Sequence, residues 1–343
     1  MTTATAMPLP HLRRSFADLR DDEVRELVRP ALGTLADDAR VERPGQGINN
    51  RTYVVRARDG SGAVVKMRPR SIAPVDDSPQ WPPYTRQLFG PFPNGDLATL
   101  PALTLELAAH GSIRPPAILH LDVSLEHVAA PYVVSELLPG RPLGWDDARP
   151  PAAGATLGDH VGRVHAATGG AGFGIYSGRG AFRLADWWDR FAAAYRTLAA
   201  EVARASAVIA AVDDMFDRAL ERARATGTPA GSALICVDQS PTHYLGPGDG
   251  TISALVDIEG HLFAPAEFEL AVLQLWLPET RPLAHAYERH LPWPRALLEQ
   301  VRPAYWLFTW LEWIYCLRTL AHDDERARAL EQGAARLARQ IVP

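Results

Sequence analysis

Two short apolar runs interrupt the largely helical second half of the chain, and each of them ends in an aspartate. The run ICV precedes Asp238, the run ALV precedes Asp257, and a Gly-rich turn at residues 246–250 lies between them. Two carboxylates, each at the end of a short apolar strand and joined by a tight turn, can face one another across one site. The alternative is that both are ordinary turn and cap aspartates. The pattern favours one site that contains Asp238 and Asp257.

The order of the expected elements predicts an α+β fold with two lobes. Residues 15–40 have helical spacing, NNRTYVVRA and AVVKMRP form a hairpin around DGSG, and ILHLDVS and APYVVSELL are two further strands. PALTLELAAHG is a helix, and the proline-rich residues 69–96 are expected to form a long loop or insertion. We therefore expect a helical segment at 1–40, a small β-rich N-lobe at 41–138 and a larger, mostly helical C-lobe at 139–343.

Composition excludes several classes of function. The 343 residues carry a formal net charge of −5, which gives no basic footprint for nucleic acid. The two cysteines, Cys236 and Cys316, exclude a disulfide framework and fit a reducing compartment. The chain has neither an N-terminal signal-peptide pattern nor the roughly 20 apolar residues of a spanning helix. We expect a cytoplasmic protein, a monomer or homodimer, that acts on a small molecule and binds neither membrane nor nucleic acid.

Three motifs carry a resemblance to a known family. GQGINNRTYVV at 45–55, ICVDQSPTHYL at 235–245 and TISALVDIEG at 251–260 resemble motifs of the aminoglycoside phosphotransferase family, and residues 232–290 look most like its hygromycin B phosphotransferase-type members. The resemblance implies the bilobal protein-kinase-like fold. It also implies ATP, or another nucleoside triphosphate, with Mg²⁺ or Mn²⁺, and transfer of phosphate to a hydroxyl of an antibiotic, a sugar-containing metabolite or a biosynthetic intermediate.

The first lobe holds the nucleotide residues that the resemblance implies. Small residues in the first hairpin turn let backbone amides approach the nucleotide phosphates. Lys66 binds the α- and β-phosphates, and Glu106 positions it as its ion-pair partner. Main-chain groups near Glu136 to Leu138 contact the adenine. Taken alone, these features also fit a plain turn, a solvent-facing lysine, a boundary glutamate and a structural strand end. The expected turn residues are Gly45, Gly47, Asn49 and Asn50.

The second lobe holds the residues of the chemistry. The resemblance makes Asp238 the residue that orients the acceptor hydroxyl and takes its proton, and Asp257 the main metal ligand. Glu259 is an outer metal ligand or substrate contact, and Trp276 is a candidate substrate contact. Glu269 matches an acidic residue that braces the catalytic loop, and His165 is expected to be a packing histidine.

Two positions depart from the family pattern. Cys236 replaces a histidine that supports the catalytic loop, and His243 replaces an asparagine that binds metal. An imidazole is a poorer ligand for Mg²⁺ and a better one for Mn²⁺ or Zn²⁺. His243 is thus either a metal ligand or a hydrogen-bond donor to phosphate or substrate. The departures leave two alternatives to a small-molecule kinase: a pseudokinase-like binding protein, or an enzyme redirected to other nucleotide-dependent chemistry.

A tryptophan stripe occurs late in the chain. Trp306, Trp310 and Trp313 stand at helical spacing in WLFTWLEWIYCL. Such a stripe is typical of a core helix, and the alternative is a wall of the acceptor pocket.

Overall fold

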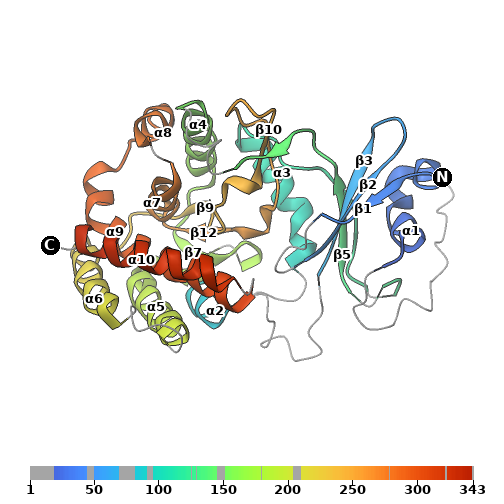
Figure 1. The fold of residues 1–343 in the computed structure, drawn as a ribbon. Coiled ribbons are helices and arrows are strands. Elements are labelled where there is room, and N and C mark those ends of the chain that lie inside the picture. The colour runs from blue at the N-terminus through green and yellow to red at the C-terminus, as the bar shows by residue number, and fades with distance from the viewer. Residues whose placement is uncertain are drawn as a thin grey trace. The chain divides into compact units, whose positions relative to one another are not determined.

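The fold is described by a computed structural model, shown in Figure 1. It describes residues 19–44, 50–68, 82–90, 96–124, 126–128, 130–144, 151–178, 180–203, 210–277, 279–320 and 323–341. The chain divides into two compact units. The first comprises residues 1–80, 93–105 and 116–138, and the second comprises residues 81–92, 106–115 and 139–343.

The first unit is built on an antiparallel five-stranded sheet in the order β1-β2-β3-β5-β4. Its elements are α1 (Asp21–Leu32), η1 (Gly33–Ala36), β1 (Arg40–Glu42), β2 (Arg51–Arg56), β3 (Gly62–Met67), η3 (Asp96–Thr99), β4 (Ile118–Asp122) and β5 (Tyr132–Glu136). The expected hairpin is present, with Val54 paired to Val64 across β2 and β3. Helix α3 (Leu100–His110) begins in this unit and ends in the second.

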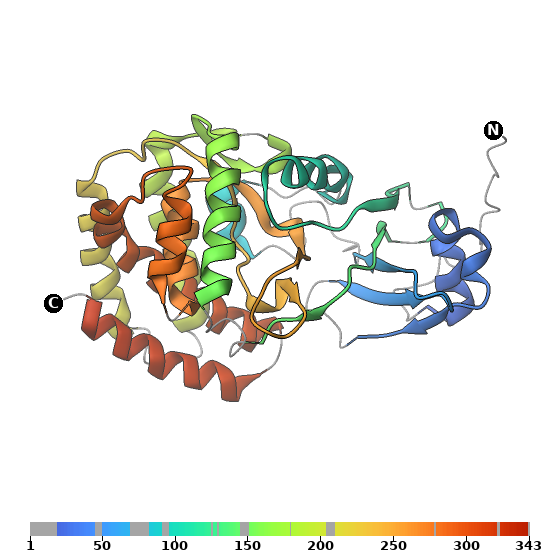
Figure 2. The ribbon, with the colours of Figure 1, turned by 90° about the horizontal axis from the view of Figure 1, so that it is seen from above.

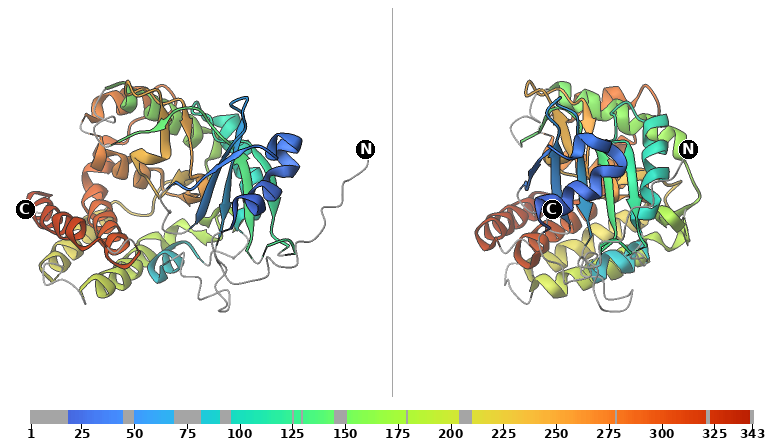
Figure 3. Two further views of the ribbon diagram at one scale, coloured as in Figure 1. Left: turned by 45° about the vertical axis from the view of Figure 1, so that its right-hand side comes forward. Right: turned by 90° about the vertical axis from the view of Figure 1, so that its right-hand side faces the viewer.

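Helix α1 covers one face of this sheet (Figure 3). Val24, Leu27 and Val28 of the helix share one core cluster with Val55 and Val65 of the strands. Side chains alternate between the two faces of a strand. Lys66, the neighbour of Val65, therefore points away from the α1 face. The expected helix at residues 15–40 is shorter than predicted, and it packs on the sheet of this unit.

The second unit combines two small sheets with a helical majority. Its helices are α2 (Pro83–Phe89), α4 (Pro151–Thr168), η4 (Tyr176–Gly178), η5 (Leu184–Asp186), α5 (Trp187–Ala203), α6 (Ala210–Ala225), η6 (Pro241–His243), η7 (Ile258–Gly260), α7 (Ala266–Trp276), α8 (Thr280–Tyr287), α9 (Arg295–Tyr315), a π-helical turn (Cys316–Leu320) and α10 (Asp324–Ile341). Its strands are β6 (Arg141–Pro142), β7 (Gly172–Ile175), β8 (Phe182–Arg183), β9 (Ala233–Cys236), β10 (Tyr244–Gly246), β11 (Ala254–Leu255) and β12 (His261–Ala264).

Helices α4 and α8 lie side by side in this unit (Figure 2), and they can do so because glycine faces the contact. A Cβ at Gly158 of α4 would lie 2.2 Å from the carbonyl oxygen of Leu283 in α8. The sheets have the orders β8-β7-β12-β9 and β11-β10-β6. The α+β class, with a β-rich first part and a mostly helical remainder, is confirmed.

Two features differ from the expectation. The proline-rich stretch 69–96, expected to be a loop or insertion, contains α2, which begins after Pro82 with Pro83 at its first position. Residues 81–92 and 106–115 group with the second unit, although the sequence places them within an N-lobe at 41–138. No helix among the described residues is long and apolar enough to cross a membrane.

Candidate active site

Two antiparallel pairings bring the expected catalytic residues together. Cys236 of β9 pairs with His261 of β12, and Tyr244 of β10 pairs with Leu255 of β11. The first pairing sets the loop after β9 beside the turn before β12. The second sets the residue before β10 beside the segment after β11. These two registers place Asp238, His243 and Asp257 at one point.

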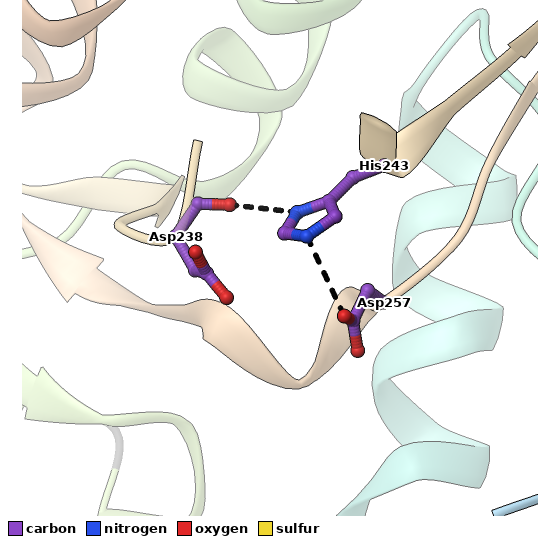
Figure 4. A group of neighbouring side chains, drawn as sticks. All are labelled: Asp238, His243 and Asp257. Atoms are coloured by element: carbon purple, nitrogen blue, oxygen red, sulfur yellow. Dashed lines mark hydrogen bonds and ion pairs between the residues drawn. The ribbon is translucent and has the colours of Figure 1, made fainter. Parts of the chain in front are cut away.

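The three side chains form one cluster of ligand atoms, shown in Figure 4. One ligand atom from each of Asp238, His243 and Asp257 lies within 4.8 Å of the other two. The imidazole lies between the main-chain carbonyl of Asp238, 2.9 Å from Nδ1, and the carboxylate of Asp257, 3.5 Å from Nε2. Asp238 is exposed, whereas the side chains of His243 and Asp257 are 15% and 39% exposed. The cluster is accessible enough to receive a ligand.

Local signals explain the two turns that carry the cluster. Ser240 caps the short helix η6 by accepting a hydrogen bond from the amide of Thr242, and Pro241 occupies its first position. Asp257 has φ 59° and ψ 49°, which makes it the one non-glycine residue with positive φ in the described part of the chain. A short polar side chain tolerates this conformation, which costs other residues roughly 1–2 kcal/mol. Such strain is characteristic of functional turns.

A glycine makes room for Asp238. A Cβ at Gly260 would lie 2.8 Å from the Cβ of Asp238 and 3.3 Å from its amide nitrogen. The carbonyl of Gly260 also accepts a hydrogen bond of 3.0 Å from the amide of Val237. The loop after β9 therefore runs directly against the turn that follows Asp257.

Glu269 of α7 supports the loop after β9 through hydrogen bonds. Its buried carboxylate accepts hydrogen bonds from the amide of Cys236 at 3.0 Å and from the side-chain amide of Gln239. The other carboxylate oxygen is 2.8 Å from Nε2 of His165, whose Nδ1 is 3.2 Å from the hydroxyl of Tyr287. The expected structural roles of Glu269 and His165 thus belong to one buried network.

Cys236 sits in this network without reactive character. It is 4% exposed, and its thiol donates a long hydrogen bond of 3.5 Å to the carbonyl oxygen of Asp238. Burial, followed by the charges of Glu269 and Asp238, raises the pKa of the thiol well above its usual value. Residue 236 supports the loop through its main-chain amide, which donates to Glu269. Any residue other than proline would keep that amide donor.

Sequence reasoning missed Gln239. The side chain is 3% exposed, donates to Glu269 and accepts a hydrogen bond of 2.8 Å from the hydroxyl of Tyr244. Its sequence signal is its place directly after a catalytic-type aspartate at the end of an apolar run, where a buried amide side chain needs hydrogen-bond partners. Gln239 fixes the main chain next to Asp238.

The nucleotide residues of the first unit are described individually. Lys66 lies on the central strand β3, half-buried, between Thr52 of β2 and Val133 of β5. It is the only lysine in the chain, and the other basic residues are arginines. That Lys66 is the only lysine is a further sequence feature that points to a role for this residue. Gly45, Gly47 and Asn49 lie outside the described residues, and Asn50 has a buried Oδ1 without a hydrogen-bond partner among them.

The strand end at Glu136 is partly occupied by the sheet itself. The amide of Glu136 donates to Ala117 over 2.8 Å, and that of Leu137 donates to Gly62 over 3.3 Å. Leu138 is buried at 5% exposure. The amides of Glu136 and Leu137 are therefore already used within the protein, and only the other main-chain groups of this segment are left to bind adenine. The adenine contact stays a prediction.

Three further expected site residues have defined surroundings in the second unit. Glu106 of α3 accepts a hydrogen bond from the hydroxyl of Tyr176, and its pairing with Lys66 stays a prediction. Glu259 lies in η7, two residues after Asp257. Trp276 is 6% exposed and packs against Tyr244 with a ring separation of 6.1 Å. The substrate roles of Glu259 and Trp276 stay predictions.

The tryptophan stripe of α9 packs against other helices of the same unit. The indole of Trp306 donates to the carbonyl of Ala271 in α7 over 2.6 Å. The ring of Trp310 lies against Gly333 of α10, where a Cβ would be 2.8 Å away. Trp313 is next to Trp310, with ring centroids 6.1 Å apart. These contacts favour the core interpretation of the stripe.

Comparison with solved structures identifies the fold. A macrolide 2′-phosphotransferase from Brachybacterium faecium is 20% identical, with a TM-score of 0.57 over 90% of this chain and 97% of that one. The GDP and kanamycin complex of APH(2″)-IIia is 15% identical, with a TM-score of 0.60 over 91% and 96% of the two chains. A thermostable mutant of aminoglycoside phosphotransferase APH(4)-Ia, in complex with AMP-PNP and hygromycin B, is 18% identical, with a TM-score of 0.56 over 92% and 98%.

No protein-family model matches the sequence, and no curated protein matches it. The likeness therefore lies in the three-dimensional structure. The chain has the protein-kinase-like fold of the aminoglycoside phosphotransferases, and the resemblance seen in its short motifs is confirmed at the level of the fold.

Proposed function

We propose that this protein is an ATP-dependent phosphotransferase that transfers phosphate to a hydroxyl of a small molecule. The observation that carries the proposal is the position of Asp238, exposed at the cluster with Asp257 and fixed by the buried carboxylate of Glu269 through its neighbours in the loop. Structures with this fold include antibiotic phosphotransferases with GDP or AMP-PNP bound. Shared fold supports the class of reaction, and the site residues support its chemistry.

Asp238 has the role of base in this proposal. Phosphoryl transfer asks the protein mainly to position the attacking oxygen and to stabilise charge. The carboxylate of Asp238 hydrogen-bonds to the acceptor hydroxyl, orients it towards the γ-phosphate and takes its proton as the new P–O bond forms. The bond between the γ-phosphorus and the β,γ-bridging oxygen breaks in the same step, and ADP leaves. The backbone of this residue is held by His243 through its carbonyl and is confined by Gly260.

Asp257 and His243 are the residues that fit the divalent ion of such an enzyme. Their donor atoms are 3.5 Å apart and both side chains are partly exposed. When bound, Mg²⁺ or Mn²⁺ offsets the negative charge of the phosphates. Asp257 presents its carboxylate from a strained turn, and His243 presents a ring nitrogen, so that the site combines oxygen and nitrogen donors.

The first unit contributes Lys66 as the proposed partner of the nucleotide phosphates. Its backbone is fixed because β3 is a central strand, hydrogen-bonded on both sides, and the ammonium group therefore extends from a rigid position. A compact ammonium acts on phosphate as a point charge, whereas arginine binds through a planar fork. Lys66 is the single lysine in a chain whose other long cationic side chains are arginines, and this supports a role in which the two are not interchangeable.

Turnover tests the proposal directly. Purified protein would be incubated with ATP, Mg²⁺ or Mn²⁺ and a panel of hydroxylated antibiotics, amino sugars and sugar derivatives, and products would be identified by mass spectrometry. We expect a phosphorylated product and stoichiometric ADP. Asp238→Asn should lower kcat by about 10²- to 10⁴-fold and leave ATP binding in place, because the base acts in the transition state.

Asp249→Asn is the matched control. Asp249 is an exposed aspartate in the next turn of the same segment, where it accepts hydrogen bonds from Thr251. Its substitution should leave kcat unchanged. If wild-type protein binds ATP but transfers phosphate neither to any compound of the panel nor to water, the proposal is wrong and the protein is a nucleotide-binding protein without kinase activity.

A further inference from the structure

We propose that Asp238, His243 and Asp257 form a binding site for a transition metal ion of the Zn²⁺ type, and that such an ion takes up the carboxylate of Asp238. The site is distinct from an all-oxygen magnesium site because one of its three donors is an imidazole nitrogen. In the described part of the chain, this is the one group of three metal-ligating side chains.

The tautomer of His243 follows from its hydrogen bond. A carbonyl oxygen only accepts, so the contact of 2.9 Å between Nδ1 and the carbonyl of Asp238 requires the proton on Nδ1. In the neutral ring, Nε2 then presents its lone pair, and that lone pair faces Oδ2 of Asp257 at 3.5 Å. Two lone pairs directed at one another attract a cation between them. A backbone carbonyl that holds Nδ1–H is also the usual outer support of a metal-binding histidine.

The spacing of the donors fits one ion. Two ligand atoms about 2.1 Å from a tetrahedral zinc ion lie about 3.4 Å apart. Nε2 of His243 and Oδ2 of Asp257 are separated by 3.5 Å, without any adjustment. Asp238 contributes the third donor, which lies within 4.8 Å of the other two. One nitrogen and two carboxylate ligands with a fourth open position resemble the ligand count of catalytic zinc sites.

The consequence for activity rests on the proposed phosphotransferase function. A carboxylate that coordinates Zn²⁺ does not take a proton from an acceptor hydroxyl. Zn²⁺ should therefore inhibit by binding the carboxylate of Asp238 and by displacing the Mg²⁺ proposed at Asp257 and His243. Mg²⁺, which binds imidazole poorly, should not engage all three groups. The inhibition would be relieved by a chelator.

Metal binding is measured first, without nucleotide or acceptor. Tag-free protein is titrated with Co²⁺ alone, and the visible absorption of four-coordinate Co²⁺ reports nitrogen and oxygen ligation. Zn²⁺ is then added to displace it, and calorimetry gives the stoichiometry. We expect one ion per chain. His243→Asn and Asp257→Asn should each weaken binding by more than the roughly 10- to 100-fold loss that follows removal of an outer partner alone.

His285→Asn is the control, because it removes an exposed surface imidazole on α8. It should bind Co²⁺ as the wild type does. Asp238→Asn tests the third ligand and should weaken Zn²⁺ binding as well. If His243→Asn binds Co²⁺ and Zn²⁺ with wild-type affinity and spectrum, the site does not exist, whether or not the protein is a kinase.

Activity gives an independent arm if turnover is found. Zn²⁺ at the concentration that fills the site should lower wild-type turnover with Mg²⁺ by a much larger factor than it lowers the turnover of His243→Asn, when each protein is compared with its own zinc-free rate. The ratio of Mn²⁺- to Mg²⁺-supported turnover should fall in the same variant. Zn²⁺ that binds stoichiometrically and leaves wild-type turnover unchanged would show that Asp238 is not a ligand.

Discussion

The main-chain amide of Cys236 donates a hydrogen bond of 3.0 Å to the buried carboxylate of Glu269, 33 residues further along the chain. This contact connects the end of β9, two residues before Asp238, to the first turn of α7. The support of the loop therefore depends on the acid in the helix and on a backbone group, and the side chain at position 236 contributes little to it.

The first prediction follows from this asymmetry. Glu269→Gln replaces an acceptor-only carboxylate by an amide that donates on one side, so that the hydrogen bonds from Cys236, Gln239 and His165 cannot all be kept. An unsatisfied buried polar group costs about 1–3 kcal/mol. We expect a loss of that size in the free energy of unfolding, measured by urea denaturation, together with reduced turnover.

Two substitutions bracket the result. Cys236→Ala keeps the amide and should retain turnover, with a stability loss on the order of 1 kcal/mol for the lost volume. Glu299→Gln, which changes an exposed acid on α9, should alter neither quantity. A Cys236→Ala variant that loses turnover as fully as Glu269→Gln would place the support in the thiol.

Much of the site could be predicted because its signals are local. Asp238 and Asp257 each follow a short apolar strand, and the pairings of β9 with β12 and β10 with β11 then fix their meeting. The rest depends on tertiary contacts. Nothing near Gln239 in the sequence specifies that its partners are Glu269 and Tyr244. The helix α2 was not predicted because it lies in a proline-rich stretch, and Pro83 occupies the first position of the helix, where proline is tolerated.

A second prediction concerns the space beside Asp238. Gly260→Ala places a methyl group 2.8 Å from the Cβ of Asp238, closer than two carbons approach without displacement. A displacement of about 1 Å at a reacting group can lower the rate on the order of 10²-fold. We expect kcat to fall by that order, with ATP binding retained in a thermal-shift assay.

Gly169→Ala is the matched control for this substitution. A Cβ at Gly169 meets no atom within 4 Å, and the residue follows α4 in the same unit. Its turnover should equal that of the wild type. Equal turnover in Gly260→Ala would show that the position of Asp238 does not limit the reaction.

The third prediction uses the single lysine. Because Lys66 is the only lysine, an amine-reactive reagent can modify only this side chain and the chain's N-terminal amine. If the ammonium contacts phosphates, ATP should protect Lys66 from modification, and mass spectrometry of the digested protein reads the protection. Lys66→Ala should weaken ATP binding, and Lys66→Arg should restore it incompletely because the guanidinium has a different shape. Modification at the same rate with and without ATP would remove Lys66 from the nucleotide site.

The last prediction concerns the pH dependence of stability, and it rests on Glu267 in the first turn of α7. The residue is 7% exposed, and burial raises the pKa of its carboxyl from 4.5 to about 7. The folded protein therefore holds a proton on Glu267 between these two values, whereas the unfolded chain releases it. Stability from this group is complete below about pH 4.5 and falls as the pH rises to about 7, by at most about 3 kcal/mol.

Glu267→Gln removes the titration and keeps the shape of the side chain. The variant has no group that titrates at this position, so its stability should not fall with pH for this reason. Its free energy of unfolding relative to the wild type should therefore increase from pH 5 to pH 8. Urea denaturation at several pH values measures the difference, and Glu299→Gln on the surface should show no such trend. A difference between Glu267→Gln and wild type that stays constant across this range would mean that Glu267 is already ionised in the folded protein.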